Sequence, residues 1–407
     1  MNAIRMSDAT PVKYHLVGIG NSRDQTFSSE VVSLVKNHRV FSGGNRHFQL
    51  VKDWIPHPHQ WIPITGKMDD LMKSYERHDE PLVIFVSGDP FFYGFGNTLK
   101  RLQPKETIRS HSYFNCIQLL AHECSMDYSR IVSTSVHGRG WEELDHALMA
   151  HRPLIGVLTD ANKSPARIAA RLLDHRFSNY TMTIGEDLEG ADHKVTTLSL
   201  EEAKSYKSND LNCVLLRRSE APKRAIGIAD HEFDGLPGRP GMITKKPIRL
   251  ATLSALQLHR TQAFWDVGSC TGSIAIEAKR MFPELHVTAF EKRPECEAII
   301  EGNAKKFQAP GIQQVIANVF ELDLTEYDRP HSIFIGGHGN RLKEMILLLD
   351  RYLMPGGVLV MNAVKPTSQA DFLTLTERLK YTLEKPVTIR VDDFNPIQLV
   401  TAHKPTP

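Results

Sequence analysis

The sequence contains no apolar run of the roughly 20 residues that a helix needs to cross a bilayer. Its first twenty residues, MNAIRMSDATPVKYHLVGIG, lack the apolar core of a signal peptide. Basic and acidic residues nearly balance, at 49 and 47, so no excess of positive charge indicates a nucleic-acid partner. We therefore expect a cytoplasmic protein that binds neither membranes nor nucleic acid.

Cysteine is also scarce, because the 407 residues include only five, an odd number without a C-x-x-C pair. This pattern argues against a disulfide framework and against structural zinc. His57 and His59 flank a proline, which is more typical of a surface loop than of a metal site. The Ser-His-Asp and Cys-His arrangements of nucleophilic enzymes are missing too. We expect reduced thiols and no metal.

Short runs rich in Val and Ile alternate with longer helical stretches along the whole chain. Alternation of this kind predicts α/β domains with mostly parallel sheets covered by helices. Residues 219–241 are charged, contain Pro and Gly and show no periodicity, so we expect a linker between domains at 1–218 and 242–407. The final stretch VTIRVDDFNPIQLVTAHK leaves room only for a hairpin, which makes the last strand antiparallel.

A glycine turn follows the first strand of the second half, in AFWDVGSCTGSIAIEAKR. Its pattern is D-x-G-x-x-x-G from Asp266 to Gly272, and Cys270 breaks the G-x-G-x-x-G of a dinucleotide site. The next strand, HVTAFEK, ends in Glu291, where a carboxylate can accept both hydroxyls of a ribose. These features favour S-adenosylmethionine as the ligand. The alternative is a turn kept only for tight packing of helix against sheet.

Four strand ends in the first half carry Gly, Asp, Asn, Ser and Thr. They are VGIGNS (17–22), VSGDPFFYG (86–94), SVHGRG (135–140) and the start of LTDANKSPARIAARLL (158–173). Each alone would be an ordinary turn between a strand and a helix. Together they are typical of the edge of a polar cleft.

The second half resembles the C-terminal domain of the precorrin-6Y C5,15-methyltransferase family. The stretches that carry this resemblance are ITKKPIRLATLSAL, WDVGSCTGSIAIEA, FIGGHG and LMPGGVLVMNAV. It implies a Rossmann-like class I methyltransferase of cobalamin biosynthesis that methylates carbon 15 and decarboxylates an acetate side chain. The family usually has glycine at the position of Cys270. A small side chain fits there if φ is not positive, so we expect a slightly altered cofactor pocket.

The first half is similar to the tetrapyrrole methylase family, a class III methyltransferase fold, through SGDPFFYG, LTDANKSPARIA and LNCVLLRR. This resemblance implies methylation of carbon 5 of precorrin-6Y. The chain departs from the family at Asn21-Ser22, where Pro-Gly is usual, and at 112–121, which replaces a loop rich in Pro and Ser. The implied substrate is a polycarboxylate macrocycle with nucleophilic meso carbons, so alignment supplies most of the rate effect. We also expect a homo-oligomer.

The expected site residues follow from these motifs. Those expected to bind S-adenosylmethionine are Gly18, Gly20, Gly88, Asp89, Pro90, Thr244, Asp266, Gly268, Ser269, Cys270, Gly272, Glu291, Asn318 and Gly336. Those expected to act in catalysis are Lys245, His338 and Asn362. Those expected to bind the carboxylates of the substrate are His137, Arg139, Arg249 and Lys365. For each charged residue the alternative is a solvated surface charge.

Other functions stay open at this point. The substrate of a methyltransferase could be a different tetrapyrrole, an RNA or a protein, although the sequence has no basic tract with interleaved aromatic residues that would support RNA. A binding module in which one cofactor site has decayed is the non-enzymatic alternative, with Cys270 as the suspect position.

Overall fold

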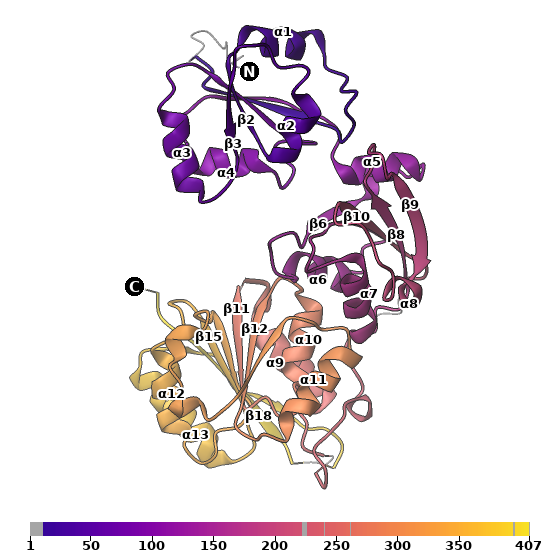
Figure 1. Ribbon diagram of the computed structural model, residues 1–407. Helices are drawn as coiled ribbons and strands as arrows, with labels where there is room; N and C mark the ends of the chain where they lie inside the picture. Colours follow the sequence, from indigo (N-terminus) through magenta and orange to yellow (C-terminus); the bar gives the residue numbers. More distant parts are fainter. Residues whose placement is uncertain (1–10, 222–225, 240, 261, 394, 407) are drawn as a thin grey trace, which may run out of the picture. The chain divides into compact units, whose positions relative to one another are not determined.

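The computed structural model describes residues 11–221, 226–239, 241–260, 262–393 and 395–406. The rest of the expected domains and linker, namely 1–10, 222–225, 240, 261, 394 and 407, lies outside the described residues. Contacts divide the chain into two compact units. The first contains the residues up to Arg139, Leu154–Ala169 and Thr181–Arg217, and the second contains Gly140–Pro153, Ala170–Tyr180 and the residues from Arg218 onward. Both units combine helices and sheets (Figure 1).

The first sheet of the first unit has the strand order β3-β2-β4-β1-β5, and every pair is parallel. Its strands are β1 (Tyr14–Ile19), β2 (Val40–Gly43), β3 (Gln60–Pro63), β4 (Leu82–Ser87) and β5 (Ile108–His111). Its helices are α1 (Ser29–Asn37), α2 (Asn45–Val51), α3 (Met68–Glu76) and α4 (Phe95–Leu102). Alternate residues of β4 face opposite layers, because Val83 packs with α1 and α2 while Ile84 packs with α3 and α4. Helices therefore cover both faces of this sheet.

The second sheet of the first unit is mixed, with the order β6-β7-β10-β8-β9. β6 and β7 are parallel, whereas β10 is antiparallel to β7 and β9 is antiparallel to β8. The strands are β6 (Val132–Ser135), β7 (Leu154–Leu158), β8 (Tyr180–Glu186), β9 (Lys194–Ser199) and β10 (Asn212–Arg218). Our expectation of mostly parallel strands is wrong for this sheet. The link between β8 and β9 is too short for the crossover that a parallel pair needs.

The helices that accompany this part of the chain are short. They are α5 (Cys116–Glu123), η1 (Tyr128–Arg130), α6 (Glu142–Met149), α7 (Pro165–Asp174) and α8 (Leu200–Ala203). Within the described ranges, every helix of the protein is too short or too polar to cross a membrane.

The sheet of the second unit has the order β13-β12-β11-β14-β15-β18-β16, and β17 also pairs with β18. The strands from β13 to β15 are parallel, and β18 runs antiparallel to β15 and β17. The strands are β11 (Ala263–Val267), β12 (His286–Glu291), β13 (Ile312–Ile316), β14 (Ser332–Ile335), β15 (Val358–Ala363), β16 (Thr382–Leu383), β17 (Val387–Ile389) and β18 (Ile397–His403). The hairpin expected at the end of the sequence corresponds to β17 and β18.

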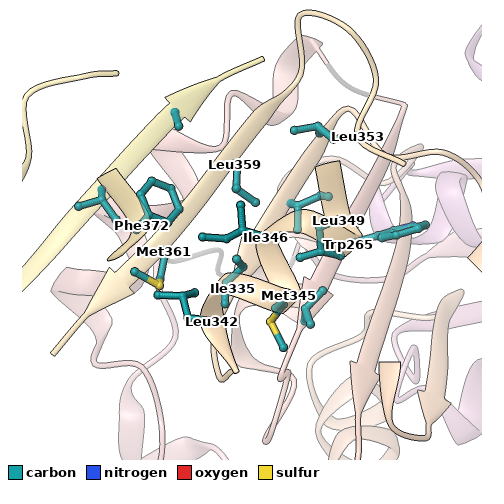
Figure 2. Close-up of a cluster of buried hydrophobic side chains, with 14 of the residues drawn as sticks. Trp265, Ile335, Leu342, Met345, Ile346, Leu349, Leu353, Leu359, Met361 and Phe372 are labelled. Carbon is teal, nitrogen blue, oxygen red and sulfur yellow. The ribbon is translucent and has the colours of Figure 1, made fainter. Parts of the chain in front are cut away.

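Helices cover both faces of this sheet as well. They are η2 (Asp230–Glu232), α9 (Lys246–Ala255), η3 (Leu258–Arg260), α10 (Ser273–Met281), α11 (Cys296–Lys306), η4 (Val319–Glu321), η5 (Leu324–Glu326), α12 (Leu342–Asp350) and α13 (Pro366–Arg378). Figure 2 shows one core, in which Ile346 of α12 and Phe372 of α13 lie against Leu359 of β15. On the other face, Leu253 of α9 and Ile274 of α10 join a separate core.

The described residues of the expected linker are 219–221, 226–239 and 241, and all of them belong to the second unit. Ile228, Phe233 and Leu236 are buried. The N–H of Ile228 donates to Glu277 Oε1 at 3.1 Å. The sequence of this segment shows no periodicity, yet three of its apolar residues are anchored in the second unit, whereas Ile226 is exposed.

Candidate active sites

A pocket of about 870 Å³ opens in the second unit at the carboxyl ends of β11 and β14. The strand order reverses here, since β11 lies between β12 and β14, and such a switch point is where open parallel sheets bind ligands. Gly268 and Gly336 follow the two strands and line the pocket. A Cβ on Gly268 would lie 2.6 Å from the nitrogen of Gly337, so only glycine permits these two turns to touch.

Asp266 lines this pocket with a carboxylate that is 1% exposed. Its Oδ2 accepts hydrogen bonds from Ser269 Oγ at 2.9 Å and from the N–H of Ala275 at 3.2 Å. Among the described residues its Oδ1 has no partner, although it is fully buried. Burial raises the pKa of Asp266 to about 7 despite these hydrogen bonds. An unpartnered carboxylate oxygen beside a cavity is suited to a cationic ligand group.

Cys270 lines the same pocket, and its φ of +54° lies in the left-handed region. The condition under which we expected a small side chain to fit is therefore not met, and the cysteine holds a conformation that glycine adopts without strain. Its Sγ donates to the carbonyl of Met242 at 3.4 Å, and burial raises the pKa of the thiol. A catalytic thiolate has the opposite requirement. Gly272, two residues after Cys270, has a φ of +75° and is the N-cap of α10.

Glu291 ends β12 as expected, and it is covered by other groups of the protein. Arg293 donates to both of its oxygens, from Nε to Oε1 at 2.9 Å and from Nη2 to Oε2 at 3.0 Å. The N–H of Cys270 donates to Oε2 at 2.9 Å. Burial raises the pKa of Glu291, but these hydrogen bonds outweigh it and hold the pKa below its usual range. A ribose that binds Glu291 must therefore displace the guanidinium of Arg293.

Four more of the expected residues line the pocket of the second unit, hereafter the second pocket. They are Thr244, Lys245, Ser269 and Asn362. Thr252 orients the amide of Asn362, because its hydroxyl donates to the carbonyl of Ile248 at 2.8 Å. The same hydroxyl oxygen must then accept from Asn362 Nδ2, at 3.0 Å. Thr252 Oγ1 also lies 3.2 Å from Asn362 Oδ1, so this one hydroxyl holds the amide of Asn362 in place.

Six expected residues of the second half do not line this pocket: Arg249, Gly272, Glu291, Asn318, His338 and Lys365. Asn318 caps a short helix by accepting from the N–H of Phe320 at 3.4 Å and donates to Glu321 at 2.6 Å. The Nε2 atom of His338 lies 3.5 Å from Ser368 Oγ. Burial and the nearby charge of Lys365 lower the pKa of His338. Lys365 is exposed at the start of α13.

Arg249 was expected to bind the substrate, and the structure contradicts this. Its side chain is 0% exposed and donates to Glu277 at 2.5 Å and to Asp230 at 3.0 Å. The guanidinium also lies 4.9 Å from the ring centre of Phe233. Arg249 thus anchors the segment before α9 in the second unit. Its charge is already matched by two carboxylates, so it is not available to a substrate.

The first unit contains a cleft of about 910 Å³. Among its lining residues are Gly20 after β1 and Gly88 and Asp89 after β4, as expected. Gly18 lies behind them, where a Cβ would come within 1.9 Å of the carbonyl oxygen of Gly88. The buried Pro90 accepts a hydrogen bond from the N–H of Gly96 at 2.9 Å and so shapes the turn rather than the cleft.

His137 and Arg139 are exposed and do not line this cleft. His137 Nδ1 lies 2.7 Å from the carbonyl oxygen of Thr159. Arg139 places its guanidinium 5.3 Å from the ring centre of Tyr93, a residue that does line the cleft. Of the two, Arg139 is therefore the one at the rim.

The sequence reasoning missed several residues of the first cleft. The missed lining residues that matter most are Asn21, Arg46, Ser87, Phe114, Leu211 and Asn212. Arg46 could have been found, because the stretch SGGNRHF follows a predicted strand and combines paired glycines with a cation. Phe114 belongs to the stretch 112–121, which departs from the family pattern, so no motif identified it. Leu211 and Asn212 open the motif LNCVLLRR, which carries the resemblance but was not expected to supply site residues.

Comparison with known proteins decides the family. A model described as a precorrin methyltransferase domain matches residues 238–406. The precorrin-6Y C(5,15)-methyltransferase (decarboxylating) of a Sinorhizobium species is 30% identical over 393 residues, which are 96% of this chain and 93% of that protein. The chain belongs to the precorrin-6Y C(5,15)-methyltransferase (decarboxylating) family. The resemblance found in the motifs is confirmed, and so is the prediction of a methyltransferase.

Two further similarities concern parts of the chain. The cobalt-precorrin-6B C(15)-methyltransferase (decarboxylating) of Salmonella typhimurium is 36% identical over 129 residues, which are 32% of this chain and 66% of that protein. A crystal structure of precorrin-6y C5,15-methyltransferase from Geobacter metallireducens has 34% sequence identity and a TM-score of 0.41. It covers 44% of this chain and 97% of that chain.

Proposed function

We propose that the chain methylates precorrin-6Y, or its cobalt-containing equivalent, at two separate sites in cobalamin biosynthesis. The first domain, 1–218, has the tetrapyrrole methylase fold and acts on carbon 5. The second, 242–407, has the Rossmann-like class I fold, acts on carbon 15 and decarboxylates an acetate side chain, and residues 219–241 connect the two. The observation that carries this proposal is the presence of a glycine-lined cleft in each unit.

The names of the relatives support the assignment of carbon 5 to one domain and of carbon 15 to the other. The family name specifies two carbons, and the Salmonella relative named for carbon 15 and decarboxylation matches only 32% of the chain. Family membership also removes the reason to consider RNA, protein or a non-catalytic binding module. A polycarboxylate macrocycle of this family remains the substrate class.

S-adenosylmethionine, when bound, supplies a sulfonium-linked methyl group, a positive charge, an ammonium group and a ribose. The second pocket fits these groups. Asp266 offers an unpartnered, buried carboxylate oxygen to a cation. Glu291 offers two further oxygens once Arg293 releases them. Gly268, Gly336 and Cys270 let the ligand approach the backbone, and Thr244 and Ser269 add hydroxyl groups.

Substrate carboxylates need cations. Lys245 lines the second pocket, and we place its ammonium against a carboxylate of the macrocycle during transfer and decarboxylation. Asn362, whose amide Thr252 holds in place, adds a polar group to the wall of the same pocket. His338, whose pKa is lowered, is neutral at pH 7 and can accept a proton but offers no charge. Lys365 beside it and Arg139 at the rim of the first cleft complete the proposed cationic set.

Mass spectrometry of the reaction products tests the two-site proposal. The unaltered chain should add two methyl groups to precorrin-6Y and remove one carbon dioxide. The double change Asp89→Ala and Gly88→Val alters the first cleft, where a side chain on Gly88, at φ +61°, would contact Asn115. It should remove one methylation and leave the other with the decarboxylation. Loss of both methylations would indicate a single shared site.

The remaining expectations are proposals of the same kind. We place the enzyme in the cytoplasm, where an odd number of thiols stays reduced. Assembly into a homo-oligomer stays a prediction, which sedimentation of the whole chain measures.

A further inference from the structure

Arg46 lines the first cleft from the first turn of α2. Its Nη2 donates to Ser87 Oγ at 2.8 Å, and its Nη1 donates to Asn21 Oδ1. Ser87 ends β4 and Asn21 follows β1, so both partners lie at the carboxyl edge of the parallel sheet. The guanidinium is thus fixed over the strand ends where a ligand binds.

Both acceptors that hold Arg46 are uncharged, and their own contacts keep them in place. Asn21 Nδ2 donates to Asp187 Oδ1 at 2.6 Å, which turns its carbonyl oxygen toward Arg46. His47 Nε2 lies 2.9 Å from Ser87 Oγ. Burial, with Arg46 nearby, lowers the pKa of His47 to about 4, so this ring is neutral at pH 7. The charge of Asp187 acts on Arg46 from beyond Asn21, and within the described part of the chain no carboxylate forms an ion pair with the guanidinium.

We propose that Arg46 binds a carboxylate of the tetrapyrrole substrate in the first cleft. A guanidinium has five N–H groups, and two of them are used by Ser87 and Asn21, which leaves three for a ligand. Arginine is the side chain best matched to a carboxylate, because its planar fork donates two parallel hydrogen bonds. The half-exposed Phe114 and Leu211 also line the cleft, and such apolar side chains suit a flat macrocycle.

A carboxylate could also come from the methionine part of the methyl donor. Exposure favours the substrate, since Arg46 is exposed while Gly88, deeper in the cleft, is buried. A ligand that reaches Arg46 from solvent and bears many carboxylates meets this position first. The inference rests on the proposed function of the first cleft, and the experiment separates the two sources.

The test compares three variants of the whole chain. Arg46→Gln removes the charge, and Arg46→Lys keeps it without the fork. Arg39→Gln is the matched control, because Arg39 lies at the opposite end of β2 and is exposed. Its guanidinium donates to the carbonyls of Lys36 and His38 and, among the described residues, to no side chain. Initial rates of carbon-5 methylation are measured against precorrin-6Y concentration, and calorimetry measures the affinity for S-adenosylmethionine.

For Arg46→Gln we expect KM for precorrin-6Y to rise at least tenfold, with kcat and the donor affinity within about twofold of the unaltered chain. Arg46→Lys should be intermediate, and Arg39→Gln should be unchanged. An unchanged KM overturns the proposal. So does a loss of donor affinity without a change in KM, which would assign Arg46 to the donor. A loss of kcat that more substrate does not relieve would make Arg46 a support for Ser87 and Asn21.

The double variant at Asp89 and Gly88 distinguishes this inference from the two-site proposal. If that variant loses both methylations, the two-site proposal fails, and the effect of Arg46→Gln on KM still decides the role of Arg46. If that variant loses one methylation while Arg46→Gln leaves KM unchanged, only the inference about Arg46 fails.

Discussion

Replacing Asp266 with asparagine should make the protein more stable and a weaker binder of the methyl donor. The carboxylate is buried and one of its oxygens has no partner among the described residues, so its charge is costly in the free protein. Its pKa is about 7, compared with 3.8 for an ordinary aspartate. A difference of about three pKa units corresponds to up to about 4 kcal/mol of lost stability once the group is ionised.

The sign of the pH dependence follows from this raised pKa. Between pH 4 and pH 7 the folded state keeps a proton on Asp266 that the unfolded state has lost, so stability falls as the pH rises through this window. Above pH 7 the penalty is complete. The Asp266→Asn variant has no such group. It should therefore match the unaltered chain near pH 4 and unfold at a higher temperature at pH 8, with the gap growing between the two.

Donor binding should change in the opposite direction. A charge-assisted hydrogen bond contributes roughly 1.5–3 kcal/mol, so Asp266→Asn should weaken S-adenosylmethionine binding at pH 8 by at least tenfold. Affinity of the unaltered pocket should fall as the pH drops below 7, because the ligand cation favours the ionised carboxylate. Affinity of the variant should not depend on pH in this range.

Differential scanning calorimetry at several pH values measures the stability, and isothermal titration measures the affinity. The titrations use chains that carry Asp89→Ala and Gly88→Val, so that the proposed first site contributes no heat. Equal unfolding temperatures at pH 8 would refute the buried, destabilising charge. Equal affinities at pH 8 would refute the placement of a cationic group at Asp266.

The remaining predictions concern the same pocket. Glu291→Ala should weaken donor binding to the whole chain at least tenfold, and the affinity of Glu291→Gln should lie between those of the alanine variant and the unaltered chain. Arg293→Gln should strengthen donor binding by roughly fivefold, or about 1 kcal/mol, because it removes the guanidinium that competes for Glu291. Titration calorimetry of these variants checks both, and equal affinities across them would remove the ribose assignment. Cys270→Gly and Cys270→Ala both lose the Sγ contact, but only glycine relieves the positive φ, so the glycine variant should be more stable by about 1 kcal/mol in denaturant unfolding. An alanine variant of equal or greater stability would show that the turn is unstrained.

Four strands could not be predicted from the sequence, and they share one physical property. They are β3, β5, β9 and β16, and each is an edge strand of its sheet. An edge strand packs against a neighbour on one side only, and residues such as those of Lys194–Ser199 alternate between exposed and half-buried. They therefore need no continuous apolar run. The central strands, such as Leu82–Ser87, are buried on both faces and show that run plainly in the sequence.

The candidate site shows a similar division. Backbone-shaping positions such as Gly268 and Gly336 could be predicted, because a close approach of two turns leaves few alternatives to glycine. Charged residues could not be placed as well. Nothing in the sequence near Arg249 indicates that Glu277 and Asp230 neutralise it inside the fold. Nothing near Glu291 shows that Arg293 folds back onto it, because a pair two residues apart can equally point apart.

In both proposed sites a carboxylate lies nearer the buried part and a cation is more exposed, and this arrangement fits the two ligands. In the second pocket the buried Asp266 lies within, and the half-buried Lys245 also lines the pocket. In the first cleft the buried Gly88 and its neighbour Asp89 lie within, and Arg46 is exposed. The methyl donor is a cation and the macrocycle is a polyanion, so each site presents the matching charge to the ligand it must meet. A cationic donor placed against a carboxylate would also lower the repulsion between that carboxylate and a polyanionic substrate.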